Sequence, residues 1–586
     1  MRERLLPALP RKHIQGLDGL RGIAVLGVVF YHLFPFTVKG GFLGVSFFFV
    51  LSGYLIAAIS SAEWEKNIFH VLQFYLKRIK RIYPSLLIVI FVTAGFLRIL
   101  ASDVLNGIRQ EVVSIIGGYN NLWQISQNAS YFTKISSASP FTHLWSLSIE
   151  LQFYLVWPVL FLSYQYLRKT KIKEYSRYLF VVLIFISFLV LEISFRPGED
   201  VTPIYYGTMP RLFSLLMGAF MGINRKSTQN LKMSNRKRKK MACSFLLLLF
   251  VLILACLFID GQGDFTYRVG LVASSLLFCM LLRLAVNANY PFGQWLDCKP
   301  LSWLGKHSYE IYLWQYPVIF IFQYKKWDNL MISPMLILIL IGILSVWLQK
   351  IVNTISETIK SGGREMKHIK KAAFWMMTVF FSFSFVLGGC SMITAPDTKK
   401  EAVQQLQEEL ERNSQELQEQ QVDTEPVENE VSLDSITAIG DSVMLGAAPA
   451  IKEVLPECVI DAKESRQVTQ AKEAANILEN KGDLGDTVII ALGTNGTFDK
   501  TAGQALIDYL GKDRNIYWIT AYGQHLQWQD YSNEVIYALA EDNENVTVID
   551  WAETAPGHSD WFYEDGIHLN ADGQKAYADF IKEGIS

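Results

Sequence analysis

Three side chains near the C-terminus have the types that nucleophilic catalysis requires. Ser442 follows Gly440 and Asp441, and Asp565 precedes His568 by three residues. A serine hydroxyl becomes a strong nucleophile only when a base takes its proton and a third group orients that base. Ser442, His568 and Asp565 could therefore act as nucleophile, base and orienting carboxylate. Taken singly, Gly-Asp-Ser is also a common turn, and Asp-x-x-His is also ordinary helix-cap chemistry.

Acyl transfer also needs hydrogen-bond donors for the negative oxygen of its tetrahedral intermediate, and they must already point at it. The candidate donors are the backbone N–H groups of Ser442 and Ser465 and the side-chain amide of Asn495. Ser465 lies in the run Asp-Ala-Lys-Glu-Ser-Arg, and Asn495 ends the run Gly-Thr-Asn. Each candidate follows a strand-like run, so we expect them to lie near one another.

The elements that must position these residues alternate along the last 150 or so residues. Strand-like and helical runs follow one another at 435–439, 458–460, 468–480, 488–492, 500–511, 516–519, 529–541 and 546–549. This rhythm predicts a three-layer α/β domain with a parallel sheet. The chemistry of such sheets sits at the carboxyl ends of the strands, where the polar residues fall.

On these residues, region 434–586 resembles the SGNH hydrolase family. Ser442 corresponds to the nucleophile block of that family, Asn495 to its third block, and Asp565 with His568 to its last block. The family usually has glycine where this chain has Ser465. The backbone N–H survives that change, although serine adopts fewer backbone conformations than glycine. The resemblance implies an acyl-enzyme at Ser442.

The composition of the whole chain indicates a membrane protein with this domain attached. Of 586 residues, 51% are hydrophobic and 19% are charged, whereas soluble proteins carry about 25% charged residues. The formal net charge of -1 argues against a nucleic-acid partner. The six cysteines lack C-x-x-C spacing, so we expect neither a metal site nor a disulfide framework.

Apolar runs long enough to span a bilayer predict eleven transmembrane helices. They lie near 17–36, 42–61, 83–102, 144–167, 178–196, 204–224, 242–260, 267–286, 301–325, 332–355 and 372–394. Lysine and arginine are concentrated in the loops that face inside if the N-terminus is cytoplasmic. The pattern therefore predicts a multi-pass protein of the cell membrane. An odd number of spans then places its C-terminal domain on the extracytoplasmic side.

Four regions follow from these patterns. They are a membrane domain of about ten helices at 1–355, a loop with an extra helix at 356–396, an acidic Gln/Glu-rich linker at 397–433, and the catalytic domain at 434–586. The linker has heptad-like apolar spacing with Asn413 at a core position. This pattern favours a short helical stalk or a solvated linker over a coiled coil. The run Leu387 to Cys390 resembles a lipoprotein processing box, although small residues also pack closely in membrane helices.

Ionisable and polar residues within the spans are costly and are therefore candidates for function. They are Arg21, His32, Arg78, Arg81, Glu150, Tyr206 and Arg211. Some have structural alternatives, since Arg21 could be a topogenic anchor and His32 an interfacial residue. The basic run at 78–81 also satisfies the positive-inside rule.

Residues 13–355 resemble the acyltransferase family 3 membrane domain. Its hallmarks are an arginine and a histidine separated by ten residues, matched by Arg21 and His32, and a glycine-rich second helix, matched by 41–53. A third hallmark is the basic start of the third helix at 78–81. The resemblance implies an acyl donor at the cytoplasmic face.

The combination of both domains resembles the peptidoglycan O-acetyltransferases. It implies transfer of acetyl from cytoplasmic acetyl-CoA, a substrate rather than a bound cofactor, to the C-6 hydroxyl of N-acetylmuramoyl residues, with lysozyme resistance as the biological outcome. His32, with Glu150 and a tyrosine such as Tyr206, would assist transfer into the membrane domain, and Ser442 would receive the acetyl group outside.

Three other functions fit the same residues. The acceptor could be a teichoic acid or another envelope polysaccharide, chosen by a groove around Trp551 and Trp561. The outer domain could instead be an acetyl esterase, because water can replace the acceptor in the same triad. A transporter or sensor with a degenerate outer domain is disfavoured by the complete Ser442, Asp565 and His568 set.

Overall fold

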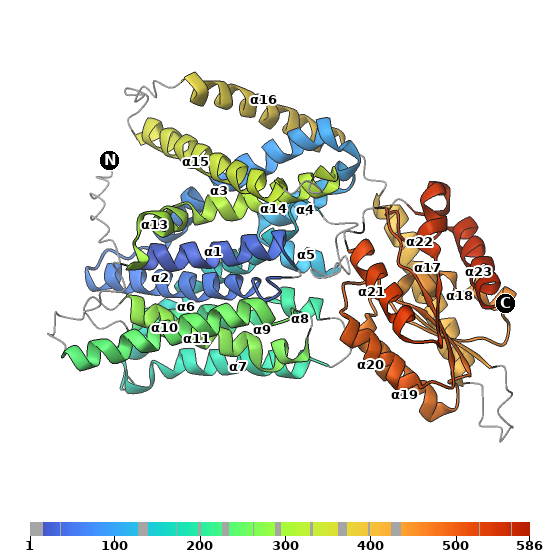
Figure 1. Ribbon diagram of the computed structural model, residues 1–586. Helices are drawn as coiled ribbons and strands as arrows, with labels where there is room; N and C mark the ends of the chain where they lie inside the picture. The colour runs from blue at the N-terminus through green and yellow to red at the C-terminus, as the bar shows by residue number, and fades with distance from the viewer. Residues whose placement is uncertain are drawn as a thin grey trace.

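The computed structural model places a large group of helices beside a C-terminal α/β domain (Figure 1). It describes residues 16–35, 37–126, 139–171, 173–196, 201–224, 234–261, 263–286, 295–327, 332–360, 372–395, 399–422, 435–524, 526, 528–563 and 565–586.

A helix covers each of the predicted spans. The long helices are α1 (Leu17–Leu33), α2 (Leu43–Glu65), α3 (Val71–Leu100), α6 (Trp145–Lys169), α7 (Tyr178–Ser194), α9 (Thr208–Ile223), α10 (Asn235–Phe258), α11 (Leu271–Ala285), α14 (Ser308–Tyr324), α15 (Ser333–Lys360) and α16 (Ala372–Thr394). Shorter ones are α4 (Ile108–Gly117), α5 (Asn120–Ser126), α8 (Thr202–Tyr206) and α13 (Lys299–Lys306). Within the described residues, 7 helices are long and apolar enough to cross a membrane by length and composition. The helical membrane character is thus confirmed, and the number eleven stays a prediction.

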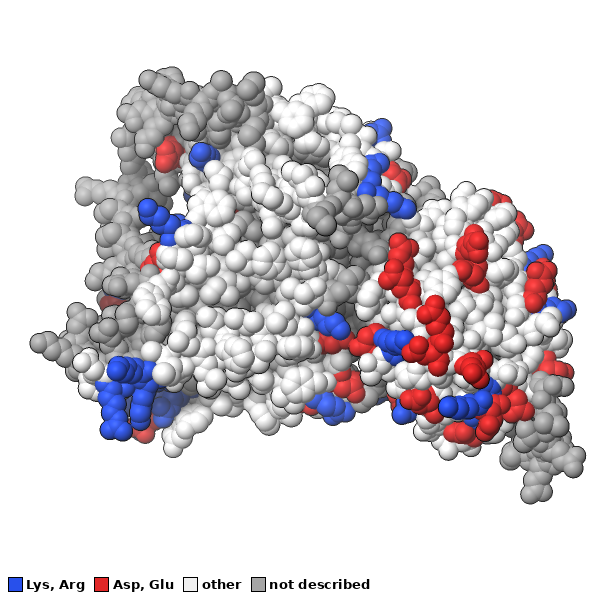
Figure 2. All heavy atoms as spheres, in the orientation of Figure 1, with Lys and Arg blue, Asp and Glu red and all other residues white. Residues whose placement is uncertain are grey.

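Charge is distributed unevenly over the visible face (Figure 2). A broad band of uncharged side chains crosses the helical region, and the densest group of Lys and Arg lies at the end farthest from the α/β domain. Asp and Glu are frequent over the α/β domain. Uncharged side chains are what a lipid-facing surface requires, because charged groups are costly in hydrocarbon.

The glycine-rich run at 41–53 has a packing explanation. A Cβ atom added to Gly53 would lie 1.9 Å from the carbonyl oxygen of Leu215 on α9, and one added to Gly218 would lie 1.9 Å from that of Val50 on α2. Neither helix could approach the other this closely with a larger residue, as is typical of small residues at membrane helix contacts.

The small residues before Cys390 also have a packing role. A Cβ on Gly388 of α16 would lie 1.9 Å from the carbonyl oxygen of Phe91, and one on Gly95 of α3 would lie 1.9 Å from that of Ser384. The packing of α16 against α3 therefore explains the small residue at 388 without lipoprotein processing.

The C-terminal domain contains a parallel five-stranded sheet, which confirms this part of the predicted fold class. Its strands are β1 (Ile436–Gly440), β2 (Val459–Ala462), β3 (Thr487–Ala491), β4 (Asn515–Ile519) and β5 (Val546–Ile549), in the order β2-β1-β3-β4-β5. Gly440 at the end of β1 pairs with Ala462 of β2 and Ala491 of β3. The loops that carry Ser442, Ser465 and Asn495 therefore leave the same edge of the sheet.

Helices cover both faces of this sheet. Two hydrophobic clusters of buried residues separate the layers, one shared with α18 (Ser442–Val454), α22 (Trp551–Thr554) and α23 (Ala571–Ile585), the other with α19 (Val468–Lys481), α20 (Lys500–Leu510) and α21 (Gln529–Asp542). Trp551 belongs to the first cluster and is only 3% exposed. It is therefore a core residue and not part of an open groove for a glycan.

The acidic stretch before the domain forms α17 (Lys399–Val422), which packs on α18. Leu410 and Asn413 are buried there, and the Asn413 side-chain amide donates to the carbonyl oxygens of Leu445 at 3.0 Å and Gly446 at 3.2 Å. Pro449 lacks the N–H that would otherwise bond to the Leu445 carbonyl, so Asn413 supplies the missing donor. The expected helix is present, but it packs on the domain through Leu410 and Asn413 and is not a free stalk. Residues 423–433 lie outside the described part of the chain.

Candidate active site

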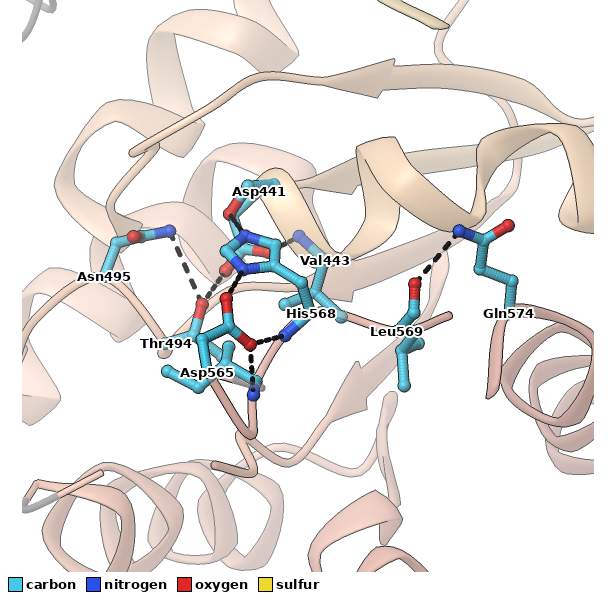
Figure 3. Close-up of polar contacts among 10 residues, drawn as sticks. Asp441, Val443, Thr494, Asn495, Asp565, His568, Leu569 and Gln574 are labelled. Atoms are coloured by element: carbon cyan, nitrogen blue, oxygen red, sulfur yellow. Dashed lines mark hydrogen bonds and ion pairs between the residues drawn. The ribbon is translucent and has the colours of Figure 1, made fainter. Parts of the chain in front are cut away.

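The carboxyl edge of the sheet brings the predicted triad together, and Figure 3 shows two of its members, His568 and Asp565. Ser442 begins α18 after Asp441, the residue that follows β1, and its Oγ lies 2.9 Å from Nε2 of His568. The other ring nitrogen, Nδ1, lies 2.6 Å from Oδ2 of Asp565. This serine–imidazole–carboxylate chain is the arrangement in which an imidazole can take a serine proton and a carboxylate can orient the imidazole.

Asp565 also organises the loop that carries it. Its Oδ1 accepts the backbone N–H groups of Ile567 and His568, each at 2.9 Å, while Oδ2 faces the imidazole. Asp-x-x-His had two alternative interpretations, a cap-like turn and a triad partner. The carboxylate makes both sets of contacts, because Oδ1 binds the backbone of the turn and Oδ2 binds the imidazole.

The electrostatics of the pair suit a general base. Burial alone would lower the pKa of His568, but the charge and hydrogen bond of Asp565, with smaller contributions from Asp441 and Glu464, raise it above its ordinary value. Burial likewise opposes ionisation of Asp565, but the charge and hydrogen bonds of His568 and nearby backbone N–H groups lower the pKa of Asp565 overall. The two shifts describe one ion pair that strengthens when the imidazole accepts a proton.

We expect the acid limb of ester turnover to follow His568, because only the neutral imidazole accepts the serine proton. Glu464→Gln removes a negative charge that raises the pKa of His568. The limb should therefore move to lower pH, by less than about one unit. The measurement is kcat/KM against pH for a small acetyl ester, with exposed Glu457→Gln as the control. A limb that stays in place or moves to higher pH would contradict the assignment.

Asp441, which the sequence pattern indicated only as part of a turn, holds the loop that carries Ser442. It is 1% exposed, caps α18 by accepting the backbone N–H of Val443 at 2.9 Å, and accepts the hydroxyl of Thr494. The side-chain amide of Asn495 lies 3.4 Å from the same Thr494 oxygen. Asp441 therefore links the first loop to the loop that carries the candidate oxyanion donor (Figure 3).

The second loop is fixed by Arg466. Its guanidinium donates to the carbonyl oxygen of Gly440 at 3.2 Å and to Oδ1 of Asp461 at 2.7 Å, and it also bonds to the Asp461 carbonyl. Ser465 beside it has a φ of 59°, in the left-handed region that glycine adopts more readily. Ser465 thus has a backbone conformation that glycine adopts more readily than serine.

The positive φ of Ser465 predicts how substitutions at position 465 affect activity and stability. Ser465→Gly should retain kcat/KM within about threefold, whereas Ser465→Val should lose about 1–2 kcal/mol of folding stability, because a β-branched residue is strained at positive φ. If the valine moves the backbone N–H, kcat/KM should also fall by roughly 100-fold. Thermal unfolding and turnover of a small acetyl ester check both values. Equal behaviour of the two variants would exclude a conformational requirement.

A cavity in the helical region is lined by four of the residues predicted to act on the acyl donor. Arg21, Arg78, Arg81 and Glu150 line it together. Glu150 accepts hydrogen bonds from the hydroxyl of Ser52 at 3.0 Å and from that of Tyr154 at 2.8 Å, and the Arg78 guanidinium lies 5.3 Å from the centre of the Tyr154 ring. Sequence analysis did not single out Ser52 or Tyr154, although Ser52 belongs to the glycine-rich run at 41–53.

His32 lies outside the set of side chains that line this cavity. Its Nδ1 is 2.8 Å from Oε1 of Gln315, and its ring contacts Tyr316, which in turn stacks on His143. Tyr312 connects the two places, because it lines the cavity and its hydroxyl donates to the carbonyl oxygen of His143. Gln315 is a partner of His32 that the sequence pattern did not reveal.

Tyr206 and Arg211 are also not among the side chains that line this cavity. Both are fully buried; the Tyr206 ring packs 5.2 Å from that of Trp145, and Arg211 donates to the hydroxyl of Ser46 at 3.1 Å. Their roles in acyl transfer stay predictions.

Comparison with known proteins identifies the helical region. The profile of the acyltransferase domain family (Acyl_transf_3) matches residues 14–349, more than half of the chain. The chain therefore belongs to this family of acyltransferases, and the resemblance predicted for residues 13–355 is confirmed.

The chain is also similar, over nearly its full length, to proteins named as O-acetyltransferases. The chain is 30% identical to O-acetyltransferase OatA of Staphylococcus aureus, with 97% of this chain and 96% of that protein covered. It is 31% identical to peptidoglycan O-acetyltransferase OatA of Listeria monocytogenes, with 97% of each covered. Among solved structures, the C-terminal catalytic domain of Streptococcus pneumoniae peptidoglycan O-acetyltransferase A with a methylsulfonyl adduct is 26% identical, covers 26% of this chain and 92% of that chain, and has a TM-score of 0.25.

Proposed function

We propose that this protein transfers acetyl groups from cytoplasmic acetyl-CoA to peptidoglycan, at the C-6 hydroxyl of N-acetylmuramoyl residues, through an acetyl ester on Ser442. The observation that carries the proposal is the hydrogen-bonded chain Ser442–His568–Asp565 in a protein whose other half is an acyltransferase domain. The names of the full-length relatives support the acetyl group and, for the Listeria protein, the peptidoglycan acceptor.

In the first outer step, Ser442 Oγ attacks the carbonyl carbon of the delivered acetyl group while His568 Nε2 takes the hydroxyl proton. The backbone N–H groups of Ser442 and Ser465 and the amide of Asn495 would stabilise the oxyanion. Collapse breaks the bond to the donor oxygen or sulfur, which leaves with the proton from His568. Acetyl-Ser442 remains.

In the second outer step, the glycan hydroxyl attacks acetyl-Ser442. His568 takes the hydroxyl proton, and collapse of the intermediate returns that proton to Ser442. Asp565 stays ionised throughout and stabilises the imidazolium by the hydrogen bond at 2.6 Å. Water in place of the glycan would give acetate, so exclusion of water decides between transferase and esterase activity.

The donor side of the proposal uses the helical region. Arg21, Arg78 and Arg81 supply three guanidinium groups to one cavity, and guanidinium groups bind phosphate oxygens well. We propose that they bind the phosphates of acetyl-CoA and that Glu150, from the same cavity, and His32 assist removal of the acetyl group. Eleven spans with a cytoplasmic N-terminus would place this cavity and the triad on the two sides of the membrane that donor and acceptor occupy.

The test uses the full-length chain, purified in detergent, with acetyl-CoA carrying a ¹³C-labelled acetyl group and muropeptide oligomers. Mass spectrometry should locate the label at C-6 of the muramoyl residue, and Ser442→Ala should abolish this. Label found only in acetate would favour the esterase. Label that enters a teichoic acid or another surface polysaccharide but not the muropeptides would move the proposal to that acceptor.

A further inference from the structure

We propose that Glu409 of α17 is a positioning residue for the loop that carries Asp565 and His568. The α/β domain would then include a helix that precedes its first strand in the chain. The inference rests on the proposed function, because it gives Glu409 a role in the chemistry of the His568 base.

One carboxylate reaches both sides of that loop. Oε2 of Glu409 accepts the hydroxyl of Tyr563 at 2.7 Å, and Oε1 accepts the side-chain amide of Gln574, also at 2.7 Å. Tyr563 lies before the triad residues of the loop, and Gln574 lies after them at the start of α23. Hydrogen bonds to an ionised carboxylate are stronger than those between neutral groups.

The two partners of Glu409 are bonded in turn to the main chain at His568. The backbone N–H of Tyr563 donates to the carbonyl oxygen of His568 at 2.8 Å, and the Tyr563 carbonyl accepts the N–H of Gly566 at 2.9 Å. On the other side, the Gln574 amide donates to the carbonyl oxygen of Leu569 at 3.0 Å (Figure 3). Each path from Glu409 therefore reaches His568 or its neighbour through two hydrogen bonds.

The surroundings of Tyr563 keep its hydroxyl protonated, as its hydrogen bond to Glu409 requires. Burial, the hydrogen bond to Glu409 and its charge raise the pKa of Tyr563 to about 12, so its hydroxyl remains a donor at physiological pH. The helix that carries Glu409 is itself held, because Leu410 is buried and Asn413 bonds to two carbonyls of α18.

The consequence for catalysis is geometric. The imidazole of His568 must stay within hydrogen-bond distance of both Ser442 and Asp565, at 2.9 and 2.6 Å. A displacement of about 1 Å in a catalytic group can cost roughly 100-fold in rate. A loop tied at both sides by Glu409 limits such displacements.

The test compares full-length variants in detergent, with p-nitrophenyl acetate as a substrate that bypasses both the membrane steps and the glycan. Glu409→Ala should lower kcat/KM by roughly 10-fold to 100-fold, and Tyr563→Phe by less, because it breaks one of the two paths. Glu416→Ala, an exposed glutamate on the same helix, is the matched control and should match the wild-type chain.

Two further measurements separate positioning from loss of fold. If the Asp565–His568 contact loosens, the raised pKa of His568 should fall, and the acid limb of kcat/KM should move to lower pH in both variants. Tyr563→Phe keeps the charge of Glu409, so its shift reports geometry alone. Hydrogen–deuterium exchange should rise in peptides covering 559–574 while the melting temperature stays close to that of the control.

Wild-type exchange in 559–574, or an unchanged kcat/KM and acid limb in both variants, would overturn the role of Glu409. Absence of Ser442-dependent turnover in the wild-type chain would overturn the proposed function instead. The exchange comparison would then still decide whether Glu409 holds the loop, since it does not depend on turnover.

Discussion

Ser442→Ala is expected to abolish both turnover of small acetyl esters and acetylation of the glycan. Removal of the nucleophile in a serine–histidine–aspartate triad costs on the order of 10⁶-fold in kcat. The structure supports an effect of this class, because Ser442 Oγ is the triad oxygen that faces Nε2 of His568, at 2.9 Å. Alanine removes the attacking atom and leaves the helix α18 that begins there without a change in its apolar packing.

The measurement combines turnover of p-nitrophenyl acetate with intact-mass detection of the acetyl adduct. Ser559→Ala, at an exposed position of the same domain, is the control and should keep both signals. Adduct formation that persists in Ser442→Ala would show that another residue is the nucleophile. Such a result would remove the basis of the outer half of the mechanism.

His32→Ala is expected to abolish acetylation from acetyl-CoA and to leave ester turnover by the α/β domain unchanged. Loss of a general acid or base costs about 100-fold to 10,000-fold. The contact between Nδ1 of His32 and Oε1 of Gln315 at 2.8 Å places the ring proton on Nδ1 in the neutral form.

Two assays separate the step that involves His32 from the step at Ser442. Labelled acetyl-CoA with muropeptides reports the complete relay, whereas p-nitrophenyl acetate reports only the Ser442 step. His70→Ala, an exposed histidine before α3, should retain both. If His32→Ala supports the complete relay at the wild-type rate, His32 is a packing residue and the membrane half of the mechanism needs another group.

The sequence pattern predicts that the candidate residues of the α/β domain lie at one edge of the sheet, because strand order and strand ends are local properties. Ser442, Ser465 and Asn495 each follow a strand, and the parallel register aligns Gly440, Ala462 and Ala491 at one edge of the sheet. Their proximity therefore follows once the strands pair. The pattern does not show that Ser465 would adopt a positive φ, because that depends on the loop that Arg466 holds in place.

In the helical region, the sequence predicts where the helices lie but not how they pack. Apolar runs predict where helices lie, and each run contains one, because length and hydrophobicity are readable in any single segment. The grouping of Arg21 with Glu150 around one cavity, and the position of His32 beside Gln315 outside its lining, depend on how helices pack against one another. Close contacts such as Gly53 against Leu215 set that packing, and the partner helix is not encoded in either run.

The sequence by itself predicted a helical membrane region followed by an α/β domain, and it pointed to Ser442, His568 and Asp565, which the structure brings into hydrogen-bond contact. Residue type, hydrophobic period and strand ends are all local signals. Only the tertiary structure shows that α17 packs on the α/β domain. Its acidic, glutamine-rich pattern is typical of a solvated helix, and Glu409 meets Tyr563 and Gln574 across 154 and 165 positions of the chain. Hydrogen bonds over such separations form when the folded surfaces meet, so no local pattern contains them.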